Sequence, residues 1–231
     1  MRAPDSLIDG CAGRRFWQAK NADENAMVAI GCEVPGVSKV DLEASRDFLA
    51  QLGIGTGPGL RTVMSALEGG AGIGRFTRAI LTAVAEQVDV IEPIIKFTEC
   101  LNGTDGIRDI FNFGLEEWHP APDIKYDLIW NQGCICHLTD KQLVEYLRKC
   151  RAVLRTSSGL VIIKENISVR GFDIFDATDS TVTRHVDYEQ NQKFLSIFRE
   201  AGLRLLKSEI QRGLPRTLMP VKMYALGPDE A

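Results

Sequence analysis

The chain has 231 residues, of which 45% are hydrophobic and 25% are charged, and this composition is typical of an ordinary globular domain. Its formal net charge of -4 gives no broad basic surface for nucleic acid, and no apolar run is long enough to cross a membrane. The six cysteines are scattered and no secretory signal opens the chain, so we expect reduced thiols in a monomeric protein of the cytoplasm, with the nucleus as a second location.

Residues 1–60 differ in character from the rest of the chain and predict a helical extension. They contain Trp17 and two short helices, and residues 42–52 have the apolar spacing of an amphipathic helix. Residues 53–59 (GIGTGPG) have the composition of a turn or linker. We therefore expect an extension over residues 1–60 and a main domain over residues 61–231.

After residue 60, short apolar runs alternate with helical patterns. Strands separated by helices of this length indicate an α/β, Rossmann-like fold, with a mostly parallel seven-stranded sheet and helices on both faces. Right-handed crossovers then place the strand ends, and with them the site, along one edge of the sheet. The strands are expected at residues 62–67, 88–91, 107–111, 126–131, 160–164, 204–211 and 221–226. The helices are expected at residues 75–86, 93–101, 140–154 and 189–201, with Thr139 and Asp140 capping the third.

A glycine-rich run, residues 68–74 (EGGAGIG), connects the first predicted strand to the next helix. Glycines at alternate positions let a backbone turn sharply and approach a ligand closely, and the strand-to-helix setting is what gives such a loop meaning. A dinucleotide-binding loop needs Gly or Ala three residues after Gly72, where this chain has Arg75. The acidic start and alternating glycines instead resemble the first motif of class I methyltransferases, which bind S-adenosylmethionine. Glu68 would order the loop or hold the cofactor's ammonium through water, and Arg75 would pair with its carboxylate.

A second acid, Glu92, ends the next predicted strand about 20 residues after the loop, where a carboxylate accepts hydrogen bonds from a ribose diol. The alternative is that Glu92 only begins a helix, where Glu is favoured. Glu116 follows the third strand, where adenine is usually bracketed in such folds, although taken alone it would be an exposed loop acid.

At this point the chain resembles a specific family, the α-N-terminal protein methyltransferases, which methylate the free amino group of proteins beginning Xaa-Pro-Lys after removal of Met. The resemblance runs from about residue 16 to residue 226. It is carried by residues 70–75 (GAGIGR), 126–132 (YDLIWNQ), 137–140 (HLTD), 163–166 (IKEN) and 176–180 (DATDS), and in the extension by residues 16–17 (FW) and 41–49 (DLEASRDFL).

The resemblance implies roles for individual residues. Asp179 and His137 would act on the substrate amine as catalytic residues, and the peptide would be bound by Trp17, Asn166, Asp176 and Asp179. Trp17 would belong to an extension that covers the peptide channel. The cofactor, S-adenosylmethionine, would be bound by Glu68, Gly70, Gly72, Arg75, Glu92, Pro93, Ile94, Leu115, Glu116 and Gln132.

The residue types suit this chemistry. An α-amine has a pKa of about 7.7–8.0, and a carboxylate or imidazole within reach takes its remaining proton. Each residue also has a plainer interpretation. His137 could cap or pack at a helix start, Asp176 and Asp179 could lie in a solvated loop or form an N-cap, Asn166 could be a turn residue, and Trp17 could be a core aromatic.

Three other functions compete with peptide methylation. The family typically carries Trp where this chain has Gly133. Loss of that ring would widen the peptide channel, and this favours the alternative of a small-molecule methyltransferase on the same fold. A non-catalytic binding module would have no need of Asp179, His137 and Asn166 together. A dehydrogenase is disfavoured because the loop lacks its third small residue. We predict no metal site, because Cys134 and Cys136 are one residue too close for a zinc knuckle and no second pair follows.

Overall fold

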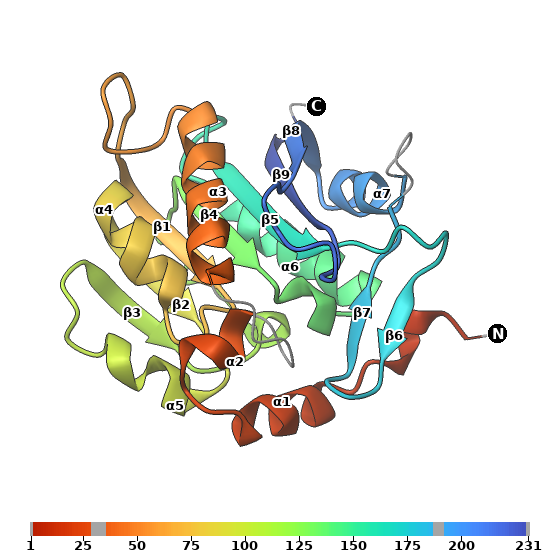
Figure 1. The fold of residues 1–231 in the computed structure, drawn as a ribbon. Helices are drawn as coiled ribbons and strands as arrows, with labels where there is room; N and C mark the ends of the chain where they lie inside the picture. Colours follow the sequence, from red (N-terminus) through yellow and green to blue (C-terminus); the bar gives the residue numbers. More distant parts are fainter. Residues whose placement is uncertain (1, 29–35, 187–191, 230–231) are drawn as a thin grey trace.

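The computed structural model describes residues 2–28, 36–186 and 192–229. Its centre is a sheet of seven strands in the order β3-β2-β1-β4-β5-β9-β8 (Figure 1). The first five of these pair in parallel, while β9 runs antiparallel to both of its neighbours, β5 and β8. The strands are β1 (Val63–Gly69), β2 (Ala85–Ile91), β3 (Ile107–Phe111), β4 (Leu128–Gln132), β5 (Leu160–Asn166), β8 (Leu203–Ile210) and β9 (Val221–Pro228). The predicted mostly parallel, seven-stranded α/β fold is therefore confirmed.

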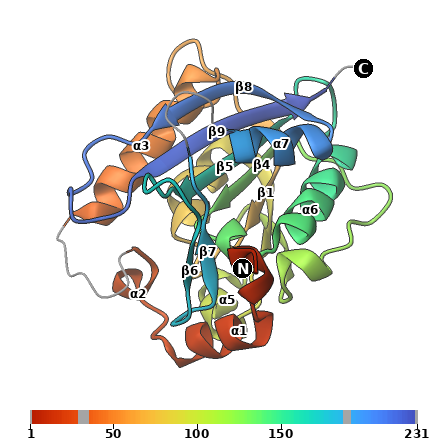
Figure 2. The same cartoon turned by 90° about the vertical axis from the view of Figure 1, so that its right-hand side faces the viewer.

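Helices cover both faces of this sheet, as predicted. One face carries α3 (Val37–Gln51), the π-helical turn η2 (Thr77–Leu81) and the short α4 (Thr82–Val84), and the other carries α6 (Asp140–Ala152) and α7 (Gln192–Glu200) (Figures 1 and 2). The remaining helices are α1 (Gly10–Ala19), α2 (Glu24–Val28), α5 (Ile95–Thr98) and the short turns η1 (Pro4–Leu7), η3 (Glu99–Leu101), η4 (Leu115–Glu117) and η5 (Ile135–His137).

Alternating side chains of the central strands build a separate core on each face. In β4, Ile129 packs with α6 and α7, while its neighbours Leu128 and Trp130 pack with α3 and η2. Successive side chains of a strand point to opposite faces, so a strand buried on both sides is apolar at most positions. Phe48 of α3 is fully buried in the second core. Part of the predicted extension therefore packs directly on the sheet of the main domain.

A small hairpin that the sequence did not predict lies at the carboxyl ends of the strands. It consists of β6 (Ile174–Asp176) and β7 (Thr181–Thr183), and Figure 2 shows it beside the N-terminal segment and α1. The backbone N–H of Asp9 donates to the Ser180 hydroxyl over 2.7 Å, and the N–H of Asp140 donates to the Asp5 carboxylate over 3.0 Å. The start of the chain is thus tied to the hairpin and to α6.

Most predicted elements are present, with boundaries that differ by a few residues. The helix expected over residues 75–86 ends at residue 84, because Ala85 and Glu86 already belong to β2. The helix expected over residues 42–52 begins earlier, at Val37, after Gly36 in a left-handed conformation. Thr139 caps α6 as predicted, and Gln142 completes the capping box. Residues 189–191, in the last predicted helix, lie outside the described residues.

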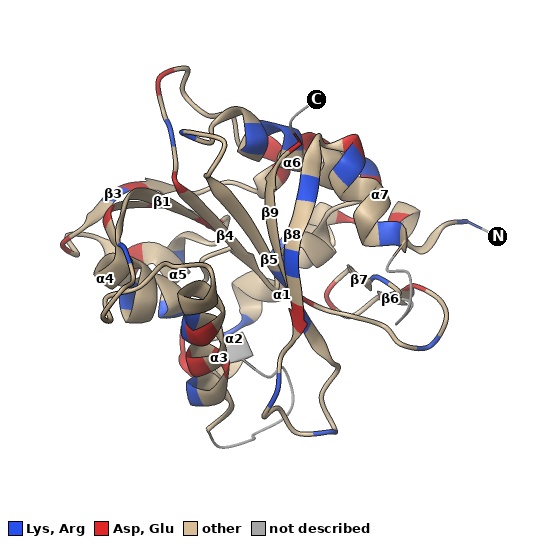
Figure 3. Ribbon diagram, turned by 90° about the horizontal axis from the view of Figure 1, so that it is seen from above, with Lys and Arg blue, Asp and Glu red and all other residues tan. Residues whose placement is uncertain are grey.

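Charged residues of both signs are interspersed over the helices of the described chain, as Figure 3 shows for α3, α6 and α7. In the same described residues, no helix has both the length and the apolar character needed to span a bilayer.

Candidate active site

A pocket of about 580 Å³ opens at the carboxyl ends of β1, β2, β4 and β5, the edge at which the sequence placed the site. Its volume lies within the range of small-molecule sites. The structure brings together in its lining every residue that the sequence singled out: Trp17, Glu68, Gly70, Gly72, Arg75, Glu92, Pro93, Ile94, Leu115, Glu116, Gln132, His137, Asn166, Asp176 and Asp179.

The glycine loop after β1 needs its glycines for two reasons. Gly70, Gly72 and Gly74 all have left-handed backbones, with φ of 69°, 54° and 68°. A Cβ on Gly70 would also lie 2.3 Å from the Cβ of Cys134, closer than two carbon atoms can approach. The loop can therefore turn sharply and pack closely against Cys134 at the edge of the pocket.

Glu92 joins the end of β2 to this loop. One of its carboxylate oxygens accepts a hydrogen bond from the Gly72 N–H over 2.8 Å, and the other accepts from the Ile94 N–H over 3.0 Å. Burial raises the pKa of Glu92 to about 7, although both backbone bonds favour the ionised form. Each oxygen has a second lone pair, so the carboxylate can still accept from a diol in the pocket.

Glu68, at the end of β1, is buried and accepts a hydrogen bond from the Thr77 hydroxyl at the start of η2. Burial raises the pKa of Glu68 to about 8, so its carboxyl group is mostly protonated at pH 7. Of the two roles that the sequence left open for Glu68, this contact favours ordering of the loop.

Arg75 makes an ion pair that the sequence did not anticipate. Its guanidinium contacts the carboxylate of Asp41, in α3. The same carboxylate accepts from the Gln132 amide over 2.9 and 3.1 Å and from the Lys164 ammonium over 2.5 Å. Burial alone would raise the pKa of Asp41, but the two cations outweigh it and hold that pKa below its usual range.

Leu115 and Glu116 lie in η4, at the pocket wall beyond β3. Leu115 is buried, and the Glu116 carboxylate accepts from the Arg14 guanidinium of α1 over 2.7 Å. Arg14 also contacts Glu117 over 2.6 Å. The extension thus holds this wall in place, and Arg14 is a site residue that sequence reasoning missed.

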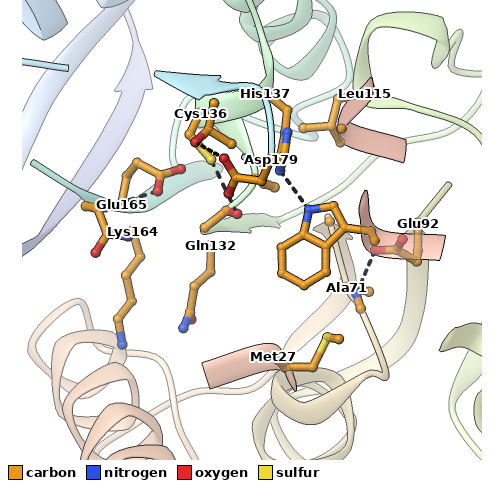
Figure 4. Close-up of a pocket in the computed structure, with 18 of the residues that line it drawn as sticks. Met27, Ala71, Glu92, Leu115, Gln132, Cys136, His137, Lys164, Glu165 and Asp179 are labelled. Carbon is orange, nitrogen blue, oxygen red and sulfur yellow. Dashed lines mark hydrogen bonds between the residues drawn. The ribbon is translucent and has the colours of Figure 1, made fainter. Parts of the chain in front are cut away.

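Trp17 lies partly buried against the pocket, where its indole Nε1 donates to Nε2 of His137 over 3.0 Å. Because Nε2 accepts this bond, the neutral ring carries its proton on Nδ1. Burial lowers the pKa of His137, against the opposing effects of Asp179 and Glu116, and the ring is therefore neutral at pH 7. Figure 4 shows His137 and Asp179 side by side in the pocket.

The predicted peptide-binding residues come from β5 and the hairpin. Asn166 ends β5 with an exposed side chain, and Asp176 ends β6. Asp179 lies in the turn between β6 and β7, where its carboxylate accepts from the Thr181 hydroxyl over 2.6 Å. Gly133 has a φ of 61°, and a Cβ there would meet no atom within 4 Å, so the pocket beside Gln132 is open.

Residues 9–227 match a family model described as the AdoMet-dependent proline di-methyltransferases. The chain belongs to this family. It is similar to the alpha N-terminal protein methyltransferase 1 of Schizosaccharomyces pombe, with 36% identity over 92% of this chain and 93% of the relative. It is also similar to the N-terminal Xaa-Pro-Lys N-methyltransferase 1 of Rattus norvegicus, with 38% identity over 82% of this chain and 83% of the relative.

A solved structure supports the same membership. A SAM-dependent methyltransferase of Leishmania major superposes with a TM-score of 0.79 and 31% sequence identity, covering 94% of this chain and 82% of that one. This proline di-methyltransferase family member is therefore an enzyme with the class I methyltransferase fold, and its cofactor is S-adenosylmethionine, as the sequence predicted.

The pocket of this methyltransferase fits that cofactor in shape and charge. Gly70, Gly72 and the buried carboxylate of Glu92 line this pocket and are residue types that suit an adenosine moiety, and Arg75 lines the same pocket as a partner for a carboxylate. Gly70 lets the loop pack closely against Cys134, which also lines the pocket. In the described part of the chain, no group of three His, Cys, Asp or Glu side chains is arranged to hold a metal ion.

Proposed function

We propose that this enzyme transfers methyl groups from S-adenosylmethionine to the free α-amino group of proteins that begin Xaa-Pro-Lys after Met removal. The observation that carries this proposal is the position of Asp179 and His137. Both line the pocket that contains the glycine loop and Glu92, so acceptor and cofactor would meet there. The relative from Rattus norvegicus is named for the same Xaa-Pro-Lys substrate class, and that from Schizosaccharomyces pombe for protein N-termini.

The chain's own residues divide the work in this proposal. When bound, S-adenosylmethionine supplies an electrophilic sulfonium methyl group, so the protein mainly positions the reactants. The carboxylate of Asp179 accepts a proton from the substrate ammonium, and Thr181 orients that carboxylate. His137 and Trp17 form the adjoining wall. Asn166 binds the peptide backbone, and Asp176 attracts the substrate lysine.

The decisive experiment is methylation of a synthetic peptide beginning Ser-Pro-Lys, followed by mass spectrometry. The matched control is the same peptide with an acetylated α-amine. We expect mass increments of 14 Da or its multiples on the free peptide alone, by the mass of a methyl group that replaces a proton. Equal labelling of both peptides would place the methyl group elsewhere and overturn the proposal.

The open space at Gly133 favours a second candidate, a small-molecule methyltransferase. This function predicts tight binding of S-adenosylhomocysteine without turnover of any N-terminal peptide. A metabolite screen with labelled cofactor distinguishes it from the first proposal.

A further inference from the structure

Three polar side chains from successive elements of the pocket converge on one carboxylate of α3. Arg75 follows β1, Gln132 ends β4, and Lys164 lies in β5, and all three contact Asp41. Figure 4 shows Gln132 and Lys164 extended in the same direction, away from Asp179 and His137. This cluster therefore lies on the side of the pocket away from those two residues.

Lys164 is the least expected member of the cluster, because its side chain is only 1% exposed. Its ammonium donates to the Asp41 carboxylate over 2.5 Å, to the Asp41 backbone carbonyl over 2.9 Å and to the Ser45 hydroxyl over 2.7 Å. A buried ammonium is tolerated when its protons are all bonded and an opposite charge is near. All three contacts lie on α3, so Lys164 is fully engaged by one helix.

The charges of the cluster do not balance. Arg75 and Lys164 contribute two positive charges, and Asp41 contributes one negative charge. Glu68 lies near enough to Arg75 to interact with it, but it is mostly protonated at neutral pH. Burial lowers the pKa of Lys164 to about 8, which still leaves the ammonium mostly charged at pH 7. One buried positive charge is left over, and it faces the pocket.

We propose that Lys164 is a positioning residue that neutralises Asp41, so that the charge of Arg75 stays available for the carboxylate of the cofactor's amino-acid moiety. A guanidinium has five N–H donors. Arg75 directs one terminal nitrogen to Asp41 and the other, over 3.4 Å, to the carbonyl and hydroxyl of Ser38, which still leaves donors for a second carboxylate. Without Lys164, Asp41 would neutralise Arg75 itself, and the subsite would have no net charge to offer. The inference rests on the proposed role of Arg75 in binding the cofactor.

Two ligands isolate this effect without any acceptor peptide. S-adenosylhomocysteine carries the amino-acid carboxylate, and 5′-methylthioadenosine has the same nucleoside and thioether without it. We would measure both dissociation constants by calorimetry for the wild-type protein and for Lys164→Met, which keeps an unbranched side chain as far as the ε carbon and removes the ammonium group. For Lys164→Met we expect the dissociation constant of S-adenosylhomocysteine to rise about tenfold, which corresponds to the loss of about one charge-assisted hydrogen bond. The dissociation constant of methylthioadenosine should stay unchanged.

A double variant tests the charge arithmetic. Asp41→Asn combined with Lys164→Met leaves Arg75 as the single charge of the cluster, so affinity for S-adenosylhomocysteine should return to within about threefold of wild type. Glu43→Gln is the control on the same helix, because Glu43 is exposed and pairs only loosely with Lys39, at 3.8 Å. Thermal melting of each variant establishes that it is folded.

Three results would overturn the proposal. Lys164→Met could weaken both ligands equally, which is the result of a purely structural role. Lys164→Met could leave the affinity for both ligands unchanged. The double variant could also bind S-adenosylhomocysteine as weakly as Lys164→Met alone. Because no peptide is present, failure here leaves the proposed N-terminal substrate untouched, and failure of peptide methylation leaves this measurement untouched.

Discussion

The indole of Trp17 donates a hydrogen bond to Nε2 of His137 over 3.0 Å, and this contact joins the N-terminal helix α1 to the turn after β4. The two rings also meet edge to face, with centroids 6.3 Å apart. Nε2 can accept this bond only while it is unprotonated. Trp17 therefore helps to keep His137 neutral, in the direction in which burial also acts.

Replacement of Trp17 by Phe should raise the pKa of His137, because it removes the donor that favours the neutral ring. The loss of this bond should also lower the free energy of unfolding by about 1 kcal/mol. The NMR titration of the His137 ring proton, together with urea denaturation, measures both effects. Leu7→Ala, at an exposed apolar residue of the same segment, serves as the control. Identical titration midpoints in wild type and Trp17→Phe would show that the hydrogen bond from Trp17 does not lower the pKa of His137.

Asp179→Asn should lower kcat/KM for an N-terminal peptide about 100-fold, because an amide cannot accept the proton of the substrate ammonium. Binding of S-adenosylhomocysteine should be unchanged, since Asp179 is assigned to the acceptor. Thr181→Val keeps the carboxylate and removes only the hydroxyl that donates to it, so its loss should be several times smaller. Steady-state kinetics and calorimetry separate the two effects. Full activity of Asp179→Asn would remove Asp179 from the catalytic assignment.

The central strands β1, β4 and β5 could be predicted from the sequence because most of their residues are buried and most of these are apolar. The strand Ile107–Phe111 has the predicted bounds, and the others differ by a few residues at their ends. The hairpin of β6 and β7 was missed for the opposite reason. Its strands have three residues each and pair only with one another, so neither carries a periodic pattern.

In the site, too, the residues that could be predicted are those marked by nearby sequence, and the residues that were missed are those defined by contacts distant in the chain. Glu92 could be found because it follows its strand directly and at a fixed distance from the glycine loop. Asp41 could not, because its partners Arg75, Gln132 and Lys164 are 34 to 123 residues away in the chain. Asp179 was predicted only from the resemblance of residues 176–180 to the family's motif, because a lone acidic residue in a turn has no sequence pattern that marks a functional role.

Glu68 should make the stability of the ligand-free protein depend on pH. Its carboxyl has a pKa of about 8 when folded, against an ordinary value of 4.5, so between these values the folded state holds a proton that the unfolded state has lost. The contribution of Glu68 to the free energy of unfolding is therefore fully present below pH 4.5 and is lost as pH rises toward 8. The free energy of unfolding of Glu68→Gln, relative to that of wild type, should therefore rise by about 2 kcal/mol from pH 6 to pH 8.

Urea denaturation of both proteins at the two pH values measures this gain. Glu92 and Glu165 are also buried with pKa values raised to about 7. Both are present in the two proteins, so the difference reports mainly on Glu68, together with the repulsion by which Glu92 raises the pKa of Glu68. Glu43→Gln, at an exposed position on α3, should show no such gain. A difference between Glu68→Gln and wild type that is the same at pH 6 and pH 8 would show that Glu68 is ionised in the folded protein.

Gly70→Ala should damage the cofactor loop more than backbone strain alone explains. Gly59 offers the comparison, because it has a similar φ of 77° but a Cβ there would meet no atom within 4 Å. Both substitutions force an L-residue into the left-handed region, at a cost of about 1 kcal/mol. Only at Gly70 does the new methyl group also collide with Cys134, whose Cβ is 2.3 Å away.

We therefore expect Gly59→Ala to lower the free energy of unfolding by about 1 kcal/mol and to leave S-adenosylhomocysteine binding intact. Gly70→Ala should cost at least about 2 kcal/mol, because overpacking adds to strain, and should weaken that binding by more than about tenfold. Chemical denaturation and calorimetry on the two variants give both numbers. If the two substitutions had equal effects, strain alone would account for Gly70, and the close packing of the loop against Cys134 would have no part in forming the cofactor site.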